Sequence, residues 1–151
     1  MLHTRNHSKS DIQHSDHSPP FDFISFTWRL LMAKILQNHY VLAVHDLHSS
    51  ASFFEKLGFT TASRPDGWIF VERDNCMVML GACPDALHPS QLGDHNYFGY
   101  LRVDDVDSYY AELKAKEIEF LSPLASKPWG MREFGVVSPE GHRIMIGQWV
   151  G

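Results

Sequence analysis

Apolar and polar residues follow one another, after a polar N-terminal stretch, first with the spacing of a strand and then with that of a helix. Residues 39–44 (HYVLAV) are apolar and rich in β-branched side chains, which is typical of a buried strand. Within residues 46–59, Leu47, Ala51 and Phe54 recur at the spacing of one helix face. The pattern therefore predicts a strand followed by an amphipathic helix.

Three short strand-like segments complete this first unit. Gly58 is expected to end the helix, because helices commonly terminate at a glycine with left-handed backbone angles. The turn sequences RPDG and RDN separate the apolar segments that follow. These segments span residues 59–63, 68–73 and 76–82. The predicted order of the unit is βαβββ.

The same order repeats after a loop that contains proline, with an offset of 59 residues. Applied to the inward positions of the first helix, this offset gives Val106, Tyr110 and Leu113, which are again apolar or aromatic. The second set of elements is predicted at residues 96–103, 105–117, 117–121, 131–137 and 142–148. We therefore predict an α+β fold of two tandem βαβββ modules, with a generic α+β sandwich as the alternative.

The N-terminal region differs in composition from these modules. Residues 1–20 hold four of the ten histidines and almost no aliphatic side chains, which predicts disorder. We interpret residues 1–32 as a disordered or dispensable extension and residues 33–151 as the folded domain, with modules at about 35–82 and 96–148. Met32 is then either the natural start or the junction with the fold. The apolar stretch before the first module is short and interrupted by charges, so we expect neither a membrane span nor a secretory signal.

Charge and cysteine content narrow the possible partners. The chain has 13 Lys and Arg against 18 Asp and Glu, and its net charge of -5 argues against a protein that binds nucleic acid phosphates. Cys76 and Cys83 are too few for a disulfide framework. We interpret them as reduced thiols and expect a cytoplasmic protein.

Three long segments carry a resemblance to a known family. They are VLAVHDLHSSASFFEKLGF, YLRVDDVDSYYAELKAKEIEF and PWGMREFGVVSPEGHRIMIG. Together they resemble the vicinal oxygen chelate superfamily of glyoxalase I, the bleomycin-resistance proteins and the extradiol dioxygenases, over residues 35–148. The third segment is closest to the bleomycin-resistance branch. The resemblance implies that each module curls its strands around half of a cleft with the helices outside, and that chains pair as homodimers with shared cavities.

The resemblance to glyoxalase I also gives the positions at which metal ligands are expected. One ligand precedes the Asp that opens each helix by seven residues, and one lies on the last strand of each module. These positions hold His39, Phe98, Met79 and Met145. Only the histidine is a suitable ligand for a divalent ion of this kind. We therefore expect no metal and no other cofactor, and we interpret Glu140 and His142 as residues of a solvated turn.

A cleft without a metal still has aromatic and polar walls. Alternation along the strands directs Phe98, Tyr100 and Arg102 into the cleft, on the side opposite the helix. The expected ligand-binding residues are His39, Met79, Phe98, Tyr100, Arg102, Trp129 and Met145. For three of them, Phe98, Met79 and Met145, an equally good interpretation is that they only fill the space that a metal site would occupy. Tyr100 and Trp129 offer stacking faces, whereas Arg102 favours an anionic or zwitterionic ligand.

Two functions from different classes remain. The first is a metal-free protein that binds a drug-like small molecule and acts by sequestration, as in antibiotic resistance. The second is a glyoxalase-like or dioxygenase-like lyase, isomerase or transferase with an atypical metal site, or a metal-free enzyme that uses His39 or a tyrosine as acid or base. The sequence favours the first, because three of the four ligand positions are apolar. We assign no catalytic residue, and we expect a small organic ligand and a second copy of the chain as partners.

Overall fold

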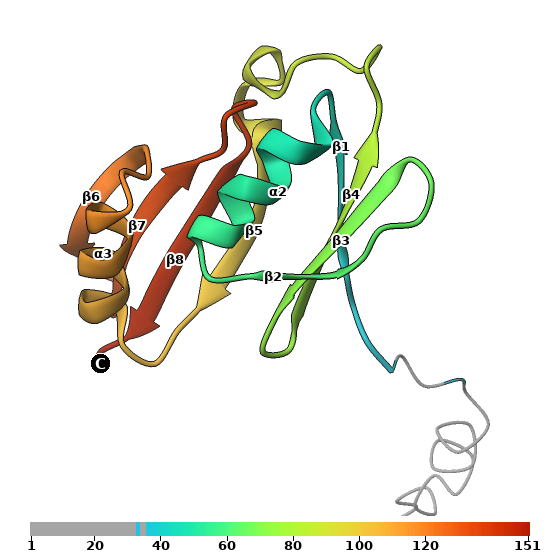
Figure 1. Ribbon diagram of the computed structural model, residues 1–151. Helices are drawn as coiled ribbons and strands as arrows, with labels where there is room; N and C mark the ends of the chain where they lie inside the picture. The colour runs from blue at the N-terminus through green and yellow to red at the C-terminus, as the bar shows by residue number, and fades with distance from the viewer. Residues whose placement is uncertain (1–32, 34–35) are drawn as a thin grey trace, which may run out of the picture. The chain divides into compact units, whose positions relative to one another are not determined.

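The computed structural model describes Ala33 and residues 36–151, and the chain is coloured along its length in Figure 1. The predicted extension, residues 1–32, lies outside the described residues. No helix in the part of the chain that is described is long and apolar enough to cross a membrane.

The first module forms a four-stranded sheet, here called sheet 1, with one helix. Its elements are β1 (Tyr40–Val44), α2 (Leu47–Lys56), β2 (Thr60–Ser63), β3 (Trp68–Arg73) and β4 (Cys76–Ala82). The strand order is β1-β4-β3-β2, in which β1 is parallel to β4 and the other pairs are antiparallel. The helix provides the crossover that a parallel pair requires.

The second module repeats this topology in sheet 2. Its elements are β5 (Tyr97–Arg102), α3 (Val106–Ala115), β6 (Phe120–Ser126), β7 (Met131–Val137) and β8 (Arg143–Trp149). The order is β5-β8-β7-β6, again with a parallel first pair. Two short 3₁₀ segments, Pro89–Gln91 and Gly93–Asn96, lie in the connection between the modules. The prediction of two tandem βαβββ modules is confirmed.

Both helices begin and end where local sequence favours it. Asp46 precedes α2 and its carboxylate accepts hydrogen bonds from the backbone amides of His48 and Ser49, at 2.9 and 3.0 Å. Asp105 caps α3 in the same way, through the amide of Ser108 at 3.0 Å. Gly58 has a φ of +86°, so the predicted helix terminus is confirmed.

One strand was predicted at the wrong residues. We expected residues 117–121, whereas β6 begins at Phe120. The chain is still turning away from α3 at this point: Glu117 has a φ of +55°, and the amide of Ile118 donates to the carbonyl of Leu113. Pro123 does not interrupt the strand, because β6 is the outer strand of its sheet and needs hydrogen bonds on one side only.

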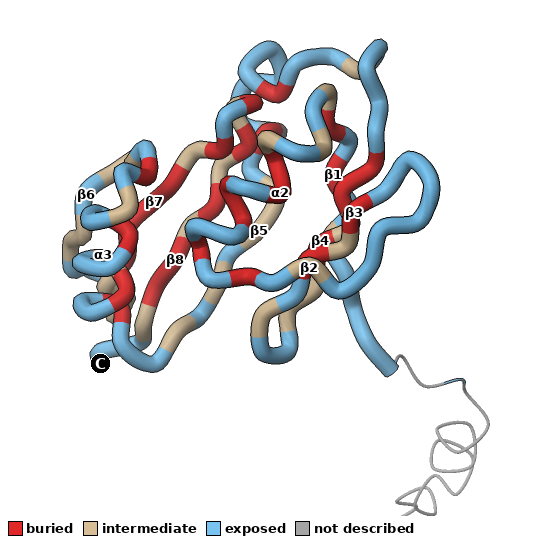
Figure 2. The backbone as a smooth tube through the Cα atoms, viewed as in Figure 1, coloured by how far each residue is buried: buried red, intermediate tan, exposed pale blue. Residues whose placement is uncertain are grey.

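The helices and the inner faces of both sheets share one apolar core. Figure 2 shows that the buried residues follow α2, α3 and the strands on which they pack. The rings of Phe54 and Phe98 lie 6.0 Å apart across the modules. The hydroxyl of Tyr109 on α3 donates to the carbonyl of Leu57, at the end of α2, over 2.6 Å. The two modules are therefore joined by buried contacts.

The turn between β7 and β8 is also part of this junction. Glu140 is only 7% exposed, and its carboxylate accepts hydrogen bonds from the backbone amides of His45 and Asp46, both at 2.8 Å. His142 is buried as well. The interpretation of these residues as a solvated turn is wrong, because the turn folds against the N-terminus of α2, where a carboxylate is favoured.

Candidate functional site

Each sheet has an inner face in the core and a second face that the helices leave uncovered, here called the open face. On sheet 1 the strand register places Val41, Met79 and Phe70 in one row across this face. Val41 is 61% exposed, whereas Leu42 and Val44 are buried, as the alternation of β1 predicts.

Aromatic and thioether groups therefore dominate the open face of sheet 1. The next row includes Gly81 and Trp68, and the indole lies so close to Gly81 that a Cβ there would be 2.8 Å from the ring. His39 is exposed and directly precedes β1. Met79 is thus on sheet 1 and His39 directly before it, apart from the predicted ligand-binding residues of sheet 2.

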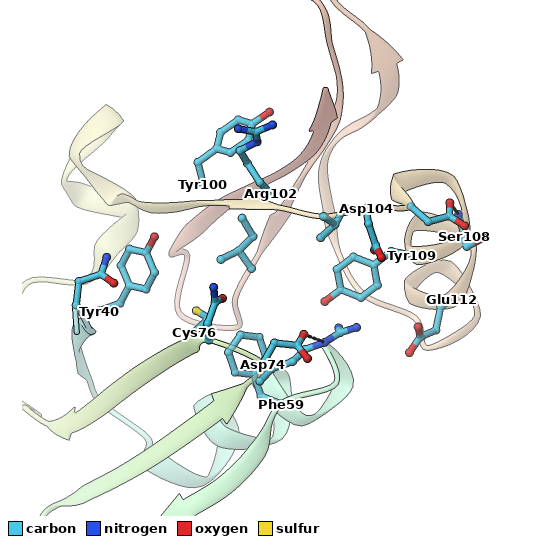
Figure 3. Close-up of a pocket in the computed structure, with 16 residues that line it drawn as sticks. Tyr40, Phe59, Asp74, Cys76, Tyr100, Arg102, Asp104, Ser108, Tyr109 and Glu112 are labelled. Atoms are coloured by element: carbon cyan, nitrogen blue, oxygen red, sulfur yellow. Dashed lines mark hydrogen bonds and ion pairs between the residues drawn. The ribbon is translucent and has the colours of Figure 1, made fainter. Parts of the chain in front are cut away.

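The open face of sheet 2 carries charged and hydroxyl side chains beside a thioether. Tyr100 and Met145 lie side by side in the register of β5 and β8, and Arg102 lies opposite Gly147 in the neighbouring row. Tyr100 is 39% exposed and Arg102 is exposed. Figure 3 shows both side chains rising from the same side of β5, away from Cys76 and Tyr109. The predicted orientation of Tyr100 and Arg102 agrees with this arrangement.

Phe98 does not share that face, so its predicted orientation toward the cleft is wrong. The register between β5 and β8 shifts between Tyr97 and Gly99, and this bulge turns Phe98 inward. Its ring packs edge-on against Tyr40 at 5.5 Å and lies 6.2 Å from His142. Phe98 is a core residue behind β5, and strict alternation fails at the bulge.

A hydrogen bond fixes Tyr100 across the sheet. Its hydroxyl donates to Oε2 of Glu133 on β7 over 2.6 Å, and Glu133 is only 6% exposed. The bond passes over Gly147, where any Cβ would overlap the tyrosine hydroxyl. Burial raises the pKa of Tyr100, and Glu133 raises it further through the hydrogen bond and its charge. Tyr100 therefore acts as a hydrogen-bond donor rather than as a phenolate.

Glu133 is absent from the ligand-binding residues predicted from the sequence. The alternation of β7 alone could have found it, since Met131, Glu133 and Gly135 share one parity and face the same side as Met145. Glu133 forms no ion pair with the adjacent Arg132. Arg132 instead forms two hydrogen bonds with Asp107 of α3, at 2.8 and 2.6 Å. Neighbouring residues of a strand point to opposite faces.

Arg102 and Trp129 are less constrained. Arg102 forms no hydrogen bond or ion pair with any residue of the described part of the chain, so its guanidinium is available to a ligand. Trp129 is 59% exposed in the turn between β6 and β7, with the Lys127 ammonium 5.9 Å from its ring. Trp149 packs against Gly130 of the same turn. The turn therefore adds aromatic surface at the end of sheet 2.

A cavity of about 940 Å³ lies along β5, between the turn from β3 to β4 and α3. Tyr100 and Arg102 line it, and the other five predicted ligand-binding residues do not. Part of the remaining lining stabilises the fold: Arg73 donates to the carbonyl of Leu57 at 2.6 Å and stacks on Tyr109. Because the side chains of Tyr100 and Arg102 rise from the other side of β5, the cavity lies behind the open face of sheet 2, at the junction of the modules.

The four positions at which the fold family places metal ligands do not suit a divalent ion. Phe98 has no donor atom and lies in the core. Met79 and Met145 offer only thioethers, which bind such ions weakly, and they belong to different sheets. Within the described residues no three His, Cys, Asp or Glu side chains converge. We therefore derive no chemical step through a metal.

Comparisons with known proteins agree with this fold. The family model described as "Glyoxalase/Bleomycin resistance protein/Dioxygenase superfamily" matches residues 36–146. A bleomycin resistance protein of Klebsiella pneumoniae is 31% identical over 113 residues, which are 70% of this chain and 86% of that protein.

Two solved structures share both the fold and part of the sequence. A bleomycin resistance determinant encoded on the transposon Tn5 is 28% identical, with a TM-score of 0.64, and the match covers 76% of this chain and 98% of that one. A bleomycin-binding protein complexed with bleomycin is 27% identical, with a TM-score of 0.65 and the same coverage. The chain belongs to the glyoxalase/bleomycin resistance protein/dioxygenase superfamily.

Proposed function

We propose that the protein binds a drug-like organic molecule at the open face of sheet 2 and acts by sequestering it, without breaking a bond. The observation that carries this proposal is the pairing of an exposed aromatic ring, Tyr100, with the uncommitted guanidinium of Arg102 on one side of β5. Relatives named for bleomycin resistance and bleomycin binding support it. In this proposal the protein confers resistance to its ligand.

The predicted ligand-binding residues make different contributions in this proposal. Tyr100 and Trp129 supply flat faces for stacking, and Met145 supplies a flexible surface that adapts to an irregular molecule. Met79 and His39 contribute from the open face of sheet 1. Phe98 makes no direct contact and instead supports β5 from the core side.

A second copy of the chain is the proposed partner. The open faces and their rims expose large apolar side chains, which a monomer in water rarely leaves uncovered as a group. These are Val41, Trp68, Tyr97, Tyr100, Trp129 and Trp149. A homodimer that brings sheet 1 of one protomer over sheet 2 of the other would cover them and unite Met79 with Tyr100 around one ligand. Light scattering at micromolar concentration should give the mass of a dimer, and a monomeric mass would contradict this part of the proposal.

We also propose that the protein acts in the cytosol. Its two cysteines are free thiols, and Cys76 is half-buried, where burial raises the pKa of its thiol and makes it a poor nucleophile. Fractionation of cells that produce the native protein is the direct test, and recovery from the periplasm or medium would oppose this assignment.

Sequestration is tested by binding and by recovery of the ligand. Thermal-shift measurements against bleomycin, other cationic antibiotics, glutathione adducts and metals should find an organic ligand that raises the melting temperature. Mass spectrometry should then recover it unchanged. Tyr100→Ala should weaken binding about tenfold, since an aromatic contact is worth roughly 0.5–1.5 kcal/mol and about 1.4 kcal/mol corresponds to that factor.

The matched control is Leu87→Ala, which removes an exposed apolar side chain outside both sheets. It should leave binding unchanged. Turnover of the bound molecule, or stabilisation by a metal alone, would contradict sequestration.

A further inference from the structure

We infer that the ligand is zwitterionic, with a cationic group that contacts Glu133 and an anionic group that contacts Arg102. This inference rests on the proposed function and specifies the class of molecule that the open face of sheet 2 takes. It follows from the position of the two charged side chains relative to Gly147 and from what surrounds each of them.

Arg102 and Glu133 lie in one row of the sheet. In the strand register both are opposite Gly147, Arg102 from β5 and Glu133 from β7. Adjacent strands are about 4.8 Å apart, so the two backbones are separated by about 10 Å. The strand between them carries no side chain at this position. The row therefore presents a positive group and a negative group on either side of Gly147, which the Tyr100 hydroxyl covers.

Glu133 lacks a cationic partner. Its one hydrogen bond within the described residues comes from the neutral hydroxyl of Tyr100, on Oε2. Among the described residues, the fully buried side-chain oxygen that lacks a hydrogen-bond partner is Oδ1 of Asn96. Oε1 of Glu133 also lacks a partner and does not belong to this class, so it is not fully buried. A largely buried carboxylate is best compensated by a charged donor, because desolvation strengthens that interaction. An ammonium or guanidinium group fits this position.

Arg102 lacks an anionic partner in the same way. No carboxylate of the described residues lies within ion-pair distance of its guanidinium, Glu133 included. Tyr100 precedes Arg102 by two residues on the same face, and its hydroxyl donates to Glu133. The guanidinium of Arg102 is therefore free to contact a ligand, and its planar shape is suited to a carboxylate or phosphate.

A ligand with a single charge would satisfy only one end of this row. A purely cationic molecule at Glu133 would leave Arg102 uncompensated nearby, and a purely anionic molecule would leave Glu133 with one neutral donor. A molecule that carries both charges compensates both side chains, while its apolar part can stack on Tyr100. The sequence led us to expect an anionic or a zwitterionic ligand, and of these two classes we infer the zwitterionic one.

The test uses four probes that share one scaffold and differ only in charge. They are the dipeptide phenylalanylglycine, its C-terminal amide, its N-acetyl derivative and the N-acetyl amide. At neutral pH they are mainly zwitterionic, cationic, anionic and neutral, because the α-amino group has a pKa of about 7.7–8.0. Dissociation constants are measured by NMR titration of the full chain. The zwitterion should bind at least about tenfold more tightly than the neutral probe.

The variants assign each charge to its residue. Glu133→Gln should weaken the zwitterion and the cation and leave the two acetylated probes unchanged. Arg102→Gln should weaken the zwitterion and the anion only. Arg143→Gln is the matched control, since this arginine stands on the same open face, in another row, beside Tyr97. If Glu133→Gln fails to fold, Arg102→Gln and the charge series of the unaltered protein still decide the question.

The outcomes separate this inference from the proposed function. Equal binding of all four probes, or a preference for the neutral one, would overturn the zwitterionic ligand and leave small-molecule binding intact. Binding of bleomycin by a protein that binds none of the dipeptides would do the same. Failure to bind the dipeptides and every molecule of the antibiotic panel would count against the proposed function itself.

Discussion

The carboxylate of Glu140 accepts a hydrogen bond from the backbone amide of Asp46 at 2.8 Å, although the two residues are separated by 94 positions and belong to different modules. The amide of His45 and the hydroxyl of Ser50 donate to the same carboxylate. Two backbone amides that lead into α2 and one hydroxyl of its first turn therefore find their hydrogen-bond acceptor on a residue of the second module. This arrangement couples the folding of the two repeats.

Replacement of Glu140 should be costly. Glu140→Gln removes the charge that these donors share, and hydrogen bonds to a charged group contribute roughly 1.5–3 kcal/mol. We expect the free energy of unfolding, measured with urea, to fall by about 2 kcal/mol. Glu55→Gln, on the exposed side of α2, is the control and should change it by less than about 0.5 kcal/mol. A similar small change in Glu140→Gln would refute the coupling.

Stability should also fall in acid, in two separate ranges. Burial raises the pKa of Glu140, but the amides of Asp46 and His45 outweigh it and hold the pKa below 4.5. The stability that this carboxylate contributes is present above that value and is lost as the pH falls through the lower pKa of the folded state. Burial lowers the pKa of His142 below 6.5, so protonation favours the unfolded chain below pH 6.5.

The histidine effect can be isolated by substitution. The carbonyl of Ala86 and the side chain of Glu140 raise the pKa of His45, so protonation of His45 favours the folded state and opposes the effect of His142. His142→Gln should therefore lose less stability than the unaltered protein between about pH 7.5 and about pH 5.5, measured by urea unfolding. An identical loss in both proteins would show that His142 does not titrate in this range.

Gly147→Ala should disturb the site without replacing a charged residue. The new methyl group would overlap the hydroxyl of Tyr100, and an overpacked position typically costs about 1–3 kcal/mol. Tyr100 should leave Glu133, and its pKa should return toward the ordinary value of 10 in a spectrophotometric titration. Gly135→Ala is the control, because its Cβ would meet the side chains of Leu121, Ser122 and Met145 at 3.1 Å and not Tyr100. An unchanged tyrosine titration in Gly147→Ala would contradict the geometry.

Protein that begins at Met32 should fold and contain no stoichiometric divalent metal. The expected extension is dispensable in this prediction, and the remaining chain offers His39 without suitable partners at Phe98, Met79 and Met145. Circular dichroism and elemental analysis are the measurements. One tightly held Zn, Ni, Mn or Fe per chain that disappears in His39→Ala would reverse the second expectation, and an unfolded chain would reverse the first.

Local patterns predicted the modules well because they report local geometry. The strands β3, β4 and β7 occur at the predicted residues, since period-2 alternation and turn residues act within a few positions. Phe98 was misplaced because a bulge depends on hydrogen bonds to β8, which the sequence of β5 does not encode. Glu140 was misinterpreted for a similar reason, as its partners are distant along the chain. Glu133 was within reach of the same alternation that oriented Tyr100.

The two glycines under aromatic side chains differ in one respect that has a consequence for the ligand. Gly81 is covered by Trp68 from the neighbouring strand β3, whereas Gly147 is crossed by Tyr100 from β5 on the other side. The two modules therefore share the same order of strands and helices, but their open faces differ in chemistry. The open face of sheet 1 is mainly apolar, whereas that of sheet 2 carries a positive and a negative side chain. A molecule bound between sheet 1 of one copy and sheet 2 of the other would contact two chemically different surfaces. It could therefore bind in one orientation only, and this orientation would be the same in both sites of a symmetric dimer.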